Sequence, residues 1–150
     1  MSARMTTPQP APASPLAPAW LPAPGDPDAL VPGLWAAGVD RAADGELTVQ
    51  GLRASALAAE FGTPLLVVDE DDFRARARAF REGFDTAFAD LCGGADVYYA
   101  GKSMLTLSTA RWAAEEGLRV DTASGGELAI ALAAGVAPAH IGLHGNNKSD

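Results

Sequence analysis

From residue 63 onward, short apolar runs alternate with longer stretches whose apolar positions recur every three or four residues. The short runs predict four strands, at residues 65–68, 96–100, 119–122 and 141–144. The longer stretches predict three helices, at residues 71–88, 104–116 and 126–134. Strands and helices that alternate in this way favour right-handed crossovers and a parallel sheet. The pattern therefore predicts an α/β fold, either the first half of a (β/α)8 barrel or a complete open doubly wound sheet.

The helix expected at residues 71–88 is amphipathic. Its apolar stripe consists of Phe73, Ala77, Phe80, Phe84 and Phe88. Three arginines, Arg74, Arg78 and Arg81, lie largely outside that stripe. Such a pattern is typical of a helix that buries one face and leaves the other in water.

The chain changes character before residue 63. Nine of its eleven prolines lie between Pro8 and Pro32, so residues 1–33 are expected to form an extended, disordered tail rich in proline and alanine. Residues 34–62 differ from this tail, because they contain a turn signal and short periodic segments. We treat residues 34–62 as a separate segment.

Within that segment, the pattern predicts one strand at residues 47–49 and one short helix at residues 55–61. Ser55 is the expected N-cap of the helix, and Gly62 is the expected stop.

Composition narrows the classes of partner. The 150 residues carry a formal net charge of −8 with no basic stripe, which argues against nucleic acid and against an anionic membrane surface. No apolar stretch is long enough to span a bilayer, and the proline-broken N-terminus does not have the pattern of a signal peptide. A cytoplasmic location is therefore the expectation.

Metal binding is not expected. Cys92 is the only cysteine, so an intrachain disulfide and a cysteine-based metal site are both excluded. His140 and His144 are four residues apart, but the segment between them predicts the start of a strand, where residues at this spacing do not converge on one metal ion.

Polar and ionisable residues follow each predicted strand, where parallel sheets place their functional groups. The first candidate is Lys102, directly after the Val- and Tyr-containing strand at 96–100. An amine held at the end of a buried strand is a nucleophile for aldehydes and can form a Schiff base. Alternation places Lys102 on one face with Tyr98 and Ala100, and the small Ala100 leaves room for a flat cofactor ring. The alternative is an ordinary surface lysine just beyond a strand end.

Two further strand exits have a structural and a functional interpretation. Ser124 and Glu127 form a capping-box pattern, although a helix N-terminus can also bind an anion. Asp121, just before them, is either a turn former or a charge partner for Lys102 or for a substrate amine. The polar run from His144 onward favours a turn, and the side-chain amide of Asn146 is a candidate for contact with a cofactor.

Four motifs together resemble a known family. They are Tyr99-Ala100-Gly101-Lys102, Glu116-Gly117-Leu118, Ser124-Gly125-Gly126-Glu127-Leu128-Ala129 and Leu143-His144-Gly145-Asn146-Asn147-Lys148-Ser149. In order and spacing they resemble diaminopimelate decarboxylase, from about residue 34 to residue 150. That family belongs to the pyridoxal-phosphate-dependent decarboxylases and racemases built on an alanine-racemase-like barrel.

The resemblance implies a fold. Residues 63–150 would be the first four βα units of a parallel (β/α)8 TIM-type barrel, as part of a longer chain. Residues 34–62 would contribute to a β-domain, and the complete enzyme would be a homodimer. The 150-residue piece by itself is expected to be inactive.

The resemblance also implies a chemistry. Lys102 would be the catalytic lysine that binds pyridoxal 5′-phosphate covalently, with Ala100, Asp121 and Asn146 beside the cofactor. The activity would be that of a carboxy-lyase that converts the amino acid meso-2,6-diaminopimelate into L-lysine and CO2, the last step of lysine biosynthesis.

Three alternatives stay open at this point. The first is a decarboxylase of the same barrel family that acts on ornithine or arginine. The second is a non-catalytic barrel that carries the same cofactor, and the third is a free-standing α/β binding module in which Lys102 has no chemical role.

Overall fold

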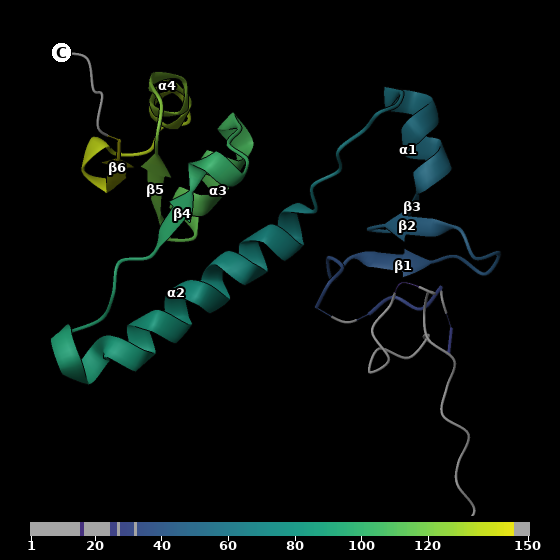
Figure 1. Ribbon diagram of the computed structural model, residues 1–150, viewed down its shortest axis with the longest axis horizontal. Coiled ribbons are helices and arrows are strands. Elements are labelled where there is room, and N and C mark those ends of the chain that lie inside the picture. Colours follow the sequence, from purple (N-terminus) through teal and green to yellow (C-terminus); the bar gives the residue numbers. More distant parts are fainter. Residues whose placement is uncertain (1–15, 17–24, 27, 32, 146–150) are drawn as a thin grey trace, which may run out of the picture. The chain divides into compact units, whose positions relative to one another are not determined.

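The computed structural model describes residue 16, residues 25–26, 28–31 and 33–145. The chain divides into two compact units, Met1–Trp35 and Ala36–Asp150. Most of the tail expected at residues 1–33 lies outside the described residues, so its predicted disorder stays a prediction. The elements described below all belong to the second unit (Figure 1).

The first elements form a small antiparallel sheet. Its strands are β1 (Val39–Arg41), β2 (Leu47–Val49) and β3 (Leu52–Arg53), in that spatial order. The strand predicted at residues 47–49 is confirmed as β2, whereas β1 and β3 were not expected. A turn at Gly45, whose φ of 85° suits glycine, connects β1 to β2.

Helix α1 (Ala54–Phe61) follows β3 directly. The predicted stop is confirmed, because Gly62 is the C-cap, with a φ of 81°. The predicted cap is wrong: Arg53 is the N-cap residue and provides no side-chain cap, and Ser55 lies inside the helix. The amide of Ser55 instead donates to the carboxylate of Glu46 at 2.8 Å, so a carboxylate from the turn before β2 satisfies one amide at the start of this helix.

The second sheet is parallel. Its order is β4 (Tyr98–Ala100), β5 (Arg119–Thr122) and β6 (Ile141–Leu143), connected by helices α3 (Leu107–Glu115) and α4 (Gly125–Ala133) (Figure 1). A short 3-10 helix, η2 (Pro138–His140), leads into β6. The predicted βα alternation is confirmed for these three strands and two helices.

Helices α3 and α4 begin at side-chain caps. The Thr106 hydroxyl accepts from the amide of Thr109 at 3.1 Å, and the Thr109 hydroxyl accepts from the amide of Thr106 at 2.9 Å, which is a reciprocal capping box. The Ser124 hydroxyl caps α4 by accepting from the amide of Glu127 at 3.2 Å. Gly117 and Gly135 follow the two helices with positive φ, as the sequence predicted.

The core lies between the parallel sheet and these helices. Val120 of β5 is fully buried against small residues of α3 and α4, namely Ala110, Ala113 and Ala131. Small side chains on the helices allow close approach to the sheet. The buried hydroxyl of Thr122 donates to the carbonyl of Gly142 at 2.9 Å, so burial of this polar group leaves no unsatisfied donor.

The strand predicted at residues 65–68 does not form. Residues 63–69 have no strand assignment, and Leu66 is 89% exposed. A strand needs a neighbour that satisfies its backbone groups, and this run pairs with no described strand. The expectation of four parallel strands is therefore wrong for the described residues: the parallel sheet has three strands and no closed barrel.

Helix α2 (Glu70–Cys92) is longer than the predicted helix. The Asp69 carboxylate caps its start by accepting from the amide of Asp72 at 3.2 Å, and Gly93 ends it in the left-handed conformation. The expected apolar stripe is only partly buried, since Phe80 is 61% exposed. Near the helix start, Phe73 packs edge-on against Tyr99 of β4 and against Trp112 of α3.

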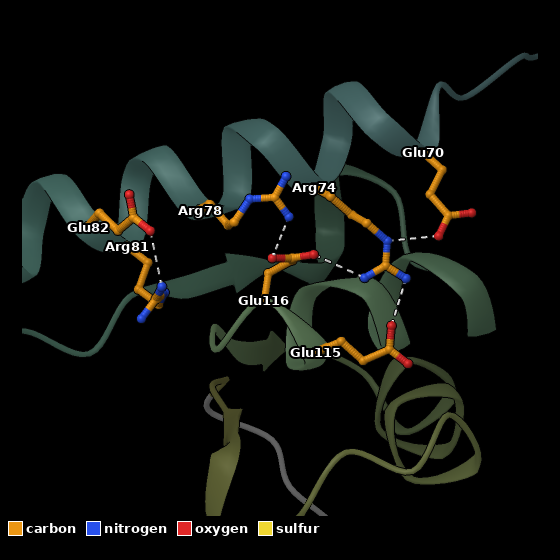
Figure 2. A network of polar contacts seen from close by, with 7 residues as sticks. All are labelled: Glu70, Arg74, Arg78, Arg81, Glu82, Glu115 and Glu116. Atoms are coloured by element: carbon orange, nitrogen blue, oxygen red, sulfur yellow. Dashed lines mark hydrogen bonds and ion pairs between the residues drawn. The ribbon is translucent and has the colours of Figure 1, made fainter.

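The arginines of α2 bind the C-terminal end of α3 through ion pairs. Figure 2 shows Arg74 between Glu70 of its own helix and the Glu115 and Glu116 carboxylates, at N–O distances of 2.7, 2.6 and 3.1 Å. Arg78 donates to Glu116 at 2.8 Å. Hydrogen bonds from Arg78 and Arg74 hold the pKa of Glu116 below its ordinary value, because they stabilise its ionised form. We call these five residues the arginine–glutamate network.

Candidate functional site

Lys102 lies in a short 3-10 helix, η1 (Gly101–Ser103), that follows β4. The expected alternation of Tyr98, Ala100 and Lys102 on one strand face is wrong for Lys102, because the chain turns into η1 after Ala100. Lys102 is exposed, as an ordinary surface lysine would be. No described residue forms an ion pair or a hydrogen bond with its ammonium group. Its amine is therefore accessible to a ligand.

Local hydrogen bonds fix the turn that carries Lys102. The Ser103 hydroxyl donates to the carbonyl of Ala100 at 2.7 Å, and the Tyr99 hydroxyl donates to the carbonyl of Met104 at 2.5 Å. Gly101 is buried, and a Cβ atom there would lie 2.7 Å from the backbone oxygen of Asp121. Only glycine allows η1 to approach β5 this closely, so Gly101 keeps Lys102 next to the end of β5.

The parallel register brings Ala100, Asp121 and Gly142 into one row across the sheet. Ala100 pairs with Asp121, and Asp121 pairs with Gly142. Successive residues of a strand point to opposite faces, and the neighbours Val120 and Thr122 are buried on the helix-covered face. Asp121 is therefore on the open face, between two positions with little or no side chain.

Asp121 forms a side-chain contact with His144, which follows β6. The Nδ1 atom of His144 lies 2.7 Å from Oδ1 of Asp121. The side chains are 49% and 27% exposed, respectively, so water reaches the pair. The sequence assigned Asp121 as a turn former or an amine partner and considered His144 in a metal pair and in a polar run. It did not predict this contact.

The turn between β5 and α4 is only partly the capping box that the sequence predicted. Ser124 caps α4 as expected. However, the Glu127 carboxylate accepts from the amide of Ala123 at 2.7 Å, one residue before the N-cap. Glu127 thus fixes the turn that directly follows Asp121. The caps made by Ser124 and Glu127 are sufficient to explain this motif, without an anion bound at the N-terminus of α4.

Two expectations concern other ligands. Within the part of the chain that the structure describes, no group of three or more His, Cys, Asp or Glu side chains could hold a metal ion, which includes the vicinity of His140 and His144. Asn146, a candidate cofactor residue, lies outside the described residues, so its role stays a prediction.

Among the described residues, no helix is both long enough and apolar enough to cross a membrane.

A cavity of about 400 Å³ lies along β4 and α2. Its lining is almost entirely apolar and includes Phe73, Phe80 and Tyr99. It borders Ala100 and Ser103. Its lining has one charged side chain, Arg76, which pairs with Asp72 at 2.7 Å, and it has no carboxylate that would recognise the amines of an amino acid. We therefore place the candidate site at the strand ends and not in this cavity.

Comparison with known proteins assigns the class. A family model described as "Pyridoxal-dependent decarboxylase, pyridoxal binding domain" matches residues 70–150, more than half of the chain and all the candidate site residues. The chain belongs to this family of pyridoxal-dependent decarboxylases.

Comparison with individual relatives indicates one enzyme within this family. The chain is 46% identical over 120 residues to the diaminopimelate decarboxylase of Mycobacterium tuberculosis, covering 80% of this chain and 25% of the relative. It is 49% identical over 116 residues to the diaminopimelate decarboxylase of Corynebacterium efficiens, covering 77% and 24%. The chain thus spans about a quarter of the length of these curated relatives. The resemblance that the sequence motifs indicated is confirmed.

Solved structures agree. A crystal structure of the diaminopimelate decarboxylase from M. jannaschii matches with a TM-score of 0.64 and 30% identity, covering 76% of this chain and 26% of that one. A second structure of that enzyme, in co-complex with L-lysine, matches equally well. The described α/β fold therefore corresponds to about a quarter of a diaminopimelate decarboxylase structure.

Proposed function

We propose that this chain supplies the lysine-bearing part of a pyridoxal-phosphate-dependent carboxy-lyase that converts meso-2,6-diaminopimelate into L-lysine and CO2. The observation that carries this proposal is the position of Lys102. It is an exposed amine without a described partner, at the carboxyl end of a parallel strand, inside the segment that matches the pyridoxal-binding family. Such an amine can react with an aldehyde.

The described residues fit the cofactor. In the row beneath Lys102, the small Ala100 on the open face of the sheet leaves space for a flat ring, whereas the side chains of Tyr98 and Asp121 lie across Gly142. Asp121 adds one carboxylate between them, which can attract a protonated nitrogen. Lys102 would hold the cofactor covalently, and Ala100 and Asp121 would lie beside it. We extend the assignment to the Asn146 amide from the sequence motif.

The cofactor, when bound, supplies an electron sink for the electron pair that the departing CO2 leaves on the substrate. Lys102 would hold the cofactor in place between turnovers, and its amine would be free while the substrate is bound. In the overall reaction, a proton replaces one α-carboxylate of the substrate, so that atoms and charge balance. The acyclic product retains the amino and carboxyl groups of the other end.

The identity of the substrate rests on the relatives. Diaminopimelate decarboxylases match at 46% and 49% identity over more than three quarters of the chain. Ornithine and arginine are the alternative substrates within the same barrel family, and the run from His144 to Ser149 is the sequence feature that favours diaminopimelate. The contribution of residues 34–62 to a β-domain, and the homodimer, are further parts of this proposal, which the resemblance supports.

A labelling experiment tests the role of Lys102. The chain has two lysines, Lys102 and Lys148, so each serves as an internal control for the other. The protein produced from its complete reading frame is incubated with pyridoxal phosphate, reduced with borohydride and digested for peptide mass spectrometry. We expect the pyridoxyl group on the Lys102 peptide and an unmodified Lys148 peptide. A label that is absent from Lys102 would overturn its assignment.

A substrate panel tests the reaction. Release of CO2 and formation of L-lysine are measured with meso-diaminopimelate, L-ornithine and L-arginine. We expect activity with diaminopimelate alone, and a fall of roughly 10³-fold or more in Lys102→Arg, because arginine keeps the charge but is not a nucleophile. Turnover of ornithine or arginine without turnover of diaminopimelate would contradict the proposed substrate.

A further inference from the structure

The contact between Asp121 and His144 is held by two independent restraints. The ring of His144 meets the carboxylate at 2.7 Å, and the backbone amide of His144 donates to the carbonyl of Thr122 at 3.0 Å. Asp121 lies in β5, and His144 directly follows the neighbouring strand β6, so the sheet fixes the relative position of the two residues. This differs from a chance encounter between two flexible surface side chains, which would lose more conformational entropy on pairing.

Gly142, which has no side chain, leaves space for the contact between Asp121 and His144. A Cβ atom at that position would lie 3.3 Å from Oδ1 of Asp121 and 3.1 Å from Cε1 of Tyr98. Both side chains thus lie across the glycine. A larger residue would crowd the carboxylate at the atom that faces His144.

The carboxylate determines the chemistry of the ring. An ionised carboxylate can only accept a hydrogen bond, so Nδ1 of His144 must carry the proton in this contact. In the neutral ring, Nε2 then has a free lone pair and can accept a proton. A half-exposed ring leaves that atom within reach of small molecules. His140, the other histidine, has no ring hydrogen bond or ion pair with any described residue.

The edge that carries this pair also carries Lys102. Ala100, two residues before Lys102, pairs with Asp121 in the parallel register. The other ionisable side chain that the described strand exits place here is Glu127, whose carboxylate already accepts from the amide of Ala123. Among the described groups at this edge, His144 therefore has one ring nitrogen held by a carboxylate and a second ring nitrogen that can accept and return a proton.

We propose that His144, oriented by Asp121, transfers protons when the substrate amine and Lys102 replace each other on the cofactor. This inference rests on the proposed function and adds a residue to it. The Nε2 atom accepts a proton from the substrate ammonium group, which leaves a neutral amine able to attack. A second proton passes directly from the attacking nitrogen to the nitrogen of Lys102, and the ring returns its own proton to the amine of Lys102 as that amine is released, so that the ring ends neutral and no further reactant is needed. Asp121 is a positioning residue that fixes the tautomer of the ring.

Nitrogen-15 NMR of the histidine rings tests the orientation in the protein from the complete reading frame. We expect His144, assigned by its loss in His144→Gln, to have a single tautomer with the proton on Nδ1. In Asp121→Asn the amide can donate to Nδ1 instead, so the tautomer should shift toward a proton on Nε2. The His140→Gln variant should leave the His144 signals unchanged. A ring that exchanges freely between tautomers in the wild-type protein would overturn the proposal.

Kinetics test the proton transfer. We expect His144→Gln to lower kcat by about 10²- to 10⁴-fold with KM changed by less than about threefold. Asp121→Asn should lower kcat by about 10- to 100-fold and shift the pH profile of kcat, as expected when an orienting group is removed. The matched control His140→Gln should retain the wild-type kcat. A His144→Gln variant with wild-type kcat and pH profile would refute the inference while leaving the proposed function intact.

A second readout does not depend on decarboxylation. The rate at which pyridoxal phosphate attaches to Lys102 can be followed by visible absorbance, and it also requires proton transfer at the amine. We expect His144→Gln to slow attachment at least tenfold, whereas His140→Gln should not. If the wild-type protein decarboxylated none of the three amino acids, the proposed function would fail, and an unchanged attachment rate in His144→Gln would refute this inference separately.

Discussion

Two strand-like segments of this chain have opposite outcomes. Residues 65–68 are four consecutive large aliphatic residues, yet they form no strand, and Leu66 is 89% exposed. The segment Arg119–Thr122 contains two charged residues and one threonine, yet it is the central strand β5, and its Val120 is fully buried, with 0% accessible surface. Apolar composition therefore does not by itself produce a strand.

The difference lies in the neighbours. Strand β5 pairs with β4 on one side and β6 on the other, and helices α3 and α4 pack against it. Its backbone groups and its apolar side chain are thus satisfied at the same time. Residues 65–68 lack both kinds of neighbour among the described residues. The candidate site lies in the paired region of the chain, because Lys102, Asp121 and His144 are all at the ends of paired strands.

A matched pair of substitutions gives the largest expected effect. Val120→Asp buries an unpaired charge and should lower the free energy of unfolding by roughly 3–5 kcal/mol. Val67→Asp, at a half-exposed position in the unpaired run, should change it by less than about 0.5 kcal/mol. Urea denaturation measures both. An equally large loss of unfolding free energy in Val67→Asp would show that residues 65–68 are buried by a partner in the complete protein. The difference between this run and β5 would then disappear.

Helix caps provide a test of intermediate size. Thr106→Ala removes one half of the capping box of α3 and should cost about 1 kcal/mol. Ser55→Ala, inside α1, removes no side-chain cap; it removes only the hydrogen bond of the Ser55 hydroxyl to the Glu46 carboxylate, and it should cost less than Thr106→Ala. Thermal unfolding monitored by circular dichroism compares the two variants. A larger loss in Ser55→Ala would support the N-cap that the sequence predicted and contradict the observed start of α1.

The arginine–glutamate network gives the smallest effect and a pH signature. The pKa of Glu116 is lowered, chiefly by the hydrogen bond from Arg78, so its stabilising contribution is complete above its ordinary value of 4.5 and is lost as the pH falls through the lowered pKa. Glu116→Gln should therefore be less stable than the wild-type protein at pH 7, and the difference should disappear in more acidic solution.

The matched control is Glu82→Gln, because Glu82 is 64% exposed and, among the residues that the structure describes, pairs with Arg81 alone, at 3.3 Å. That variant should have nearly wild-type stability at both pH values. A stability difference for Glu116→Gln that persists unchanged in acid would show that packing, and not charge, is responsible.

Local features of the sequence predicted much of the fold. Periodicity identified helices near their observed bounds, and strand β5 was predicted at its observed residues. Glycines at positions 62, 117 and 135 were correct helix stops, since a residue with positive φ follows each helix for local steric reasons. Lys102 and Asp121 were found because polar residues that follow parallel strands meet at one edge.

Other features depended on contacts between distant residues. The prediction that Ser55 caps α1 was wrong. The amide of Ser55 donates to the carboxylate of Glu46, just before β2, and sequence spacing does not reveal this partner. Lys102 left the strand alternation because Gly101 packs against the backbone of Asp121. Residues 65–68 form no strand because no other described segment pairs with them, although their composition favours a strand.

The sequence by itself determined which residues can form helices, where those helices stop and which polar groups follow the strands, because these properties depend on steric limits and periodicity within a few residues. Only the tertiary structure decided that Asp121 lies beside His144 with Gly142 beneath the contact. That arrangement requires the register of two parallel strands connected by a helix, and register is set by side-chain packing and backbone pairing across the whole sheet.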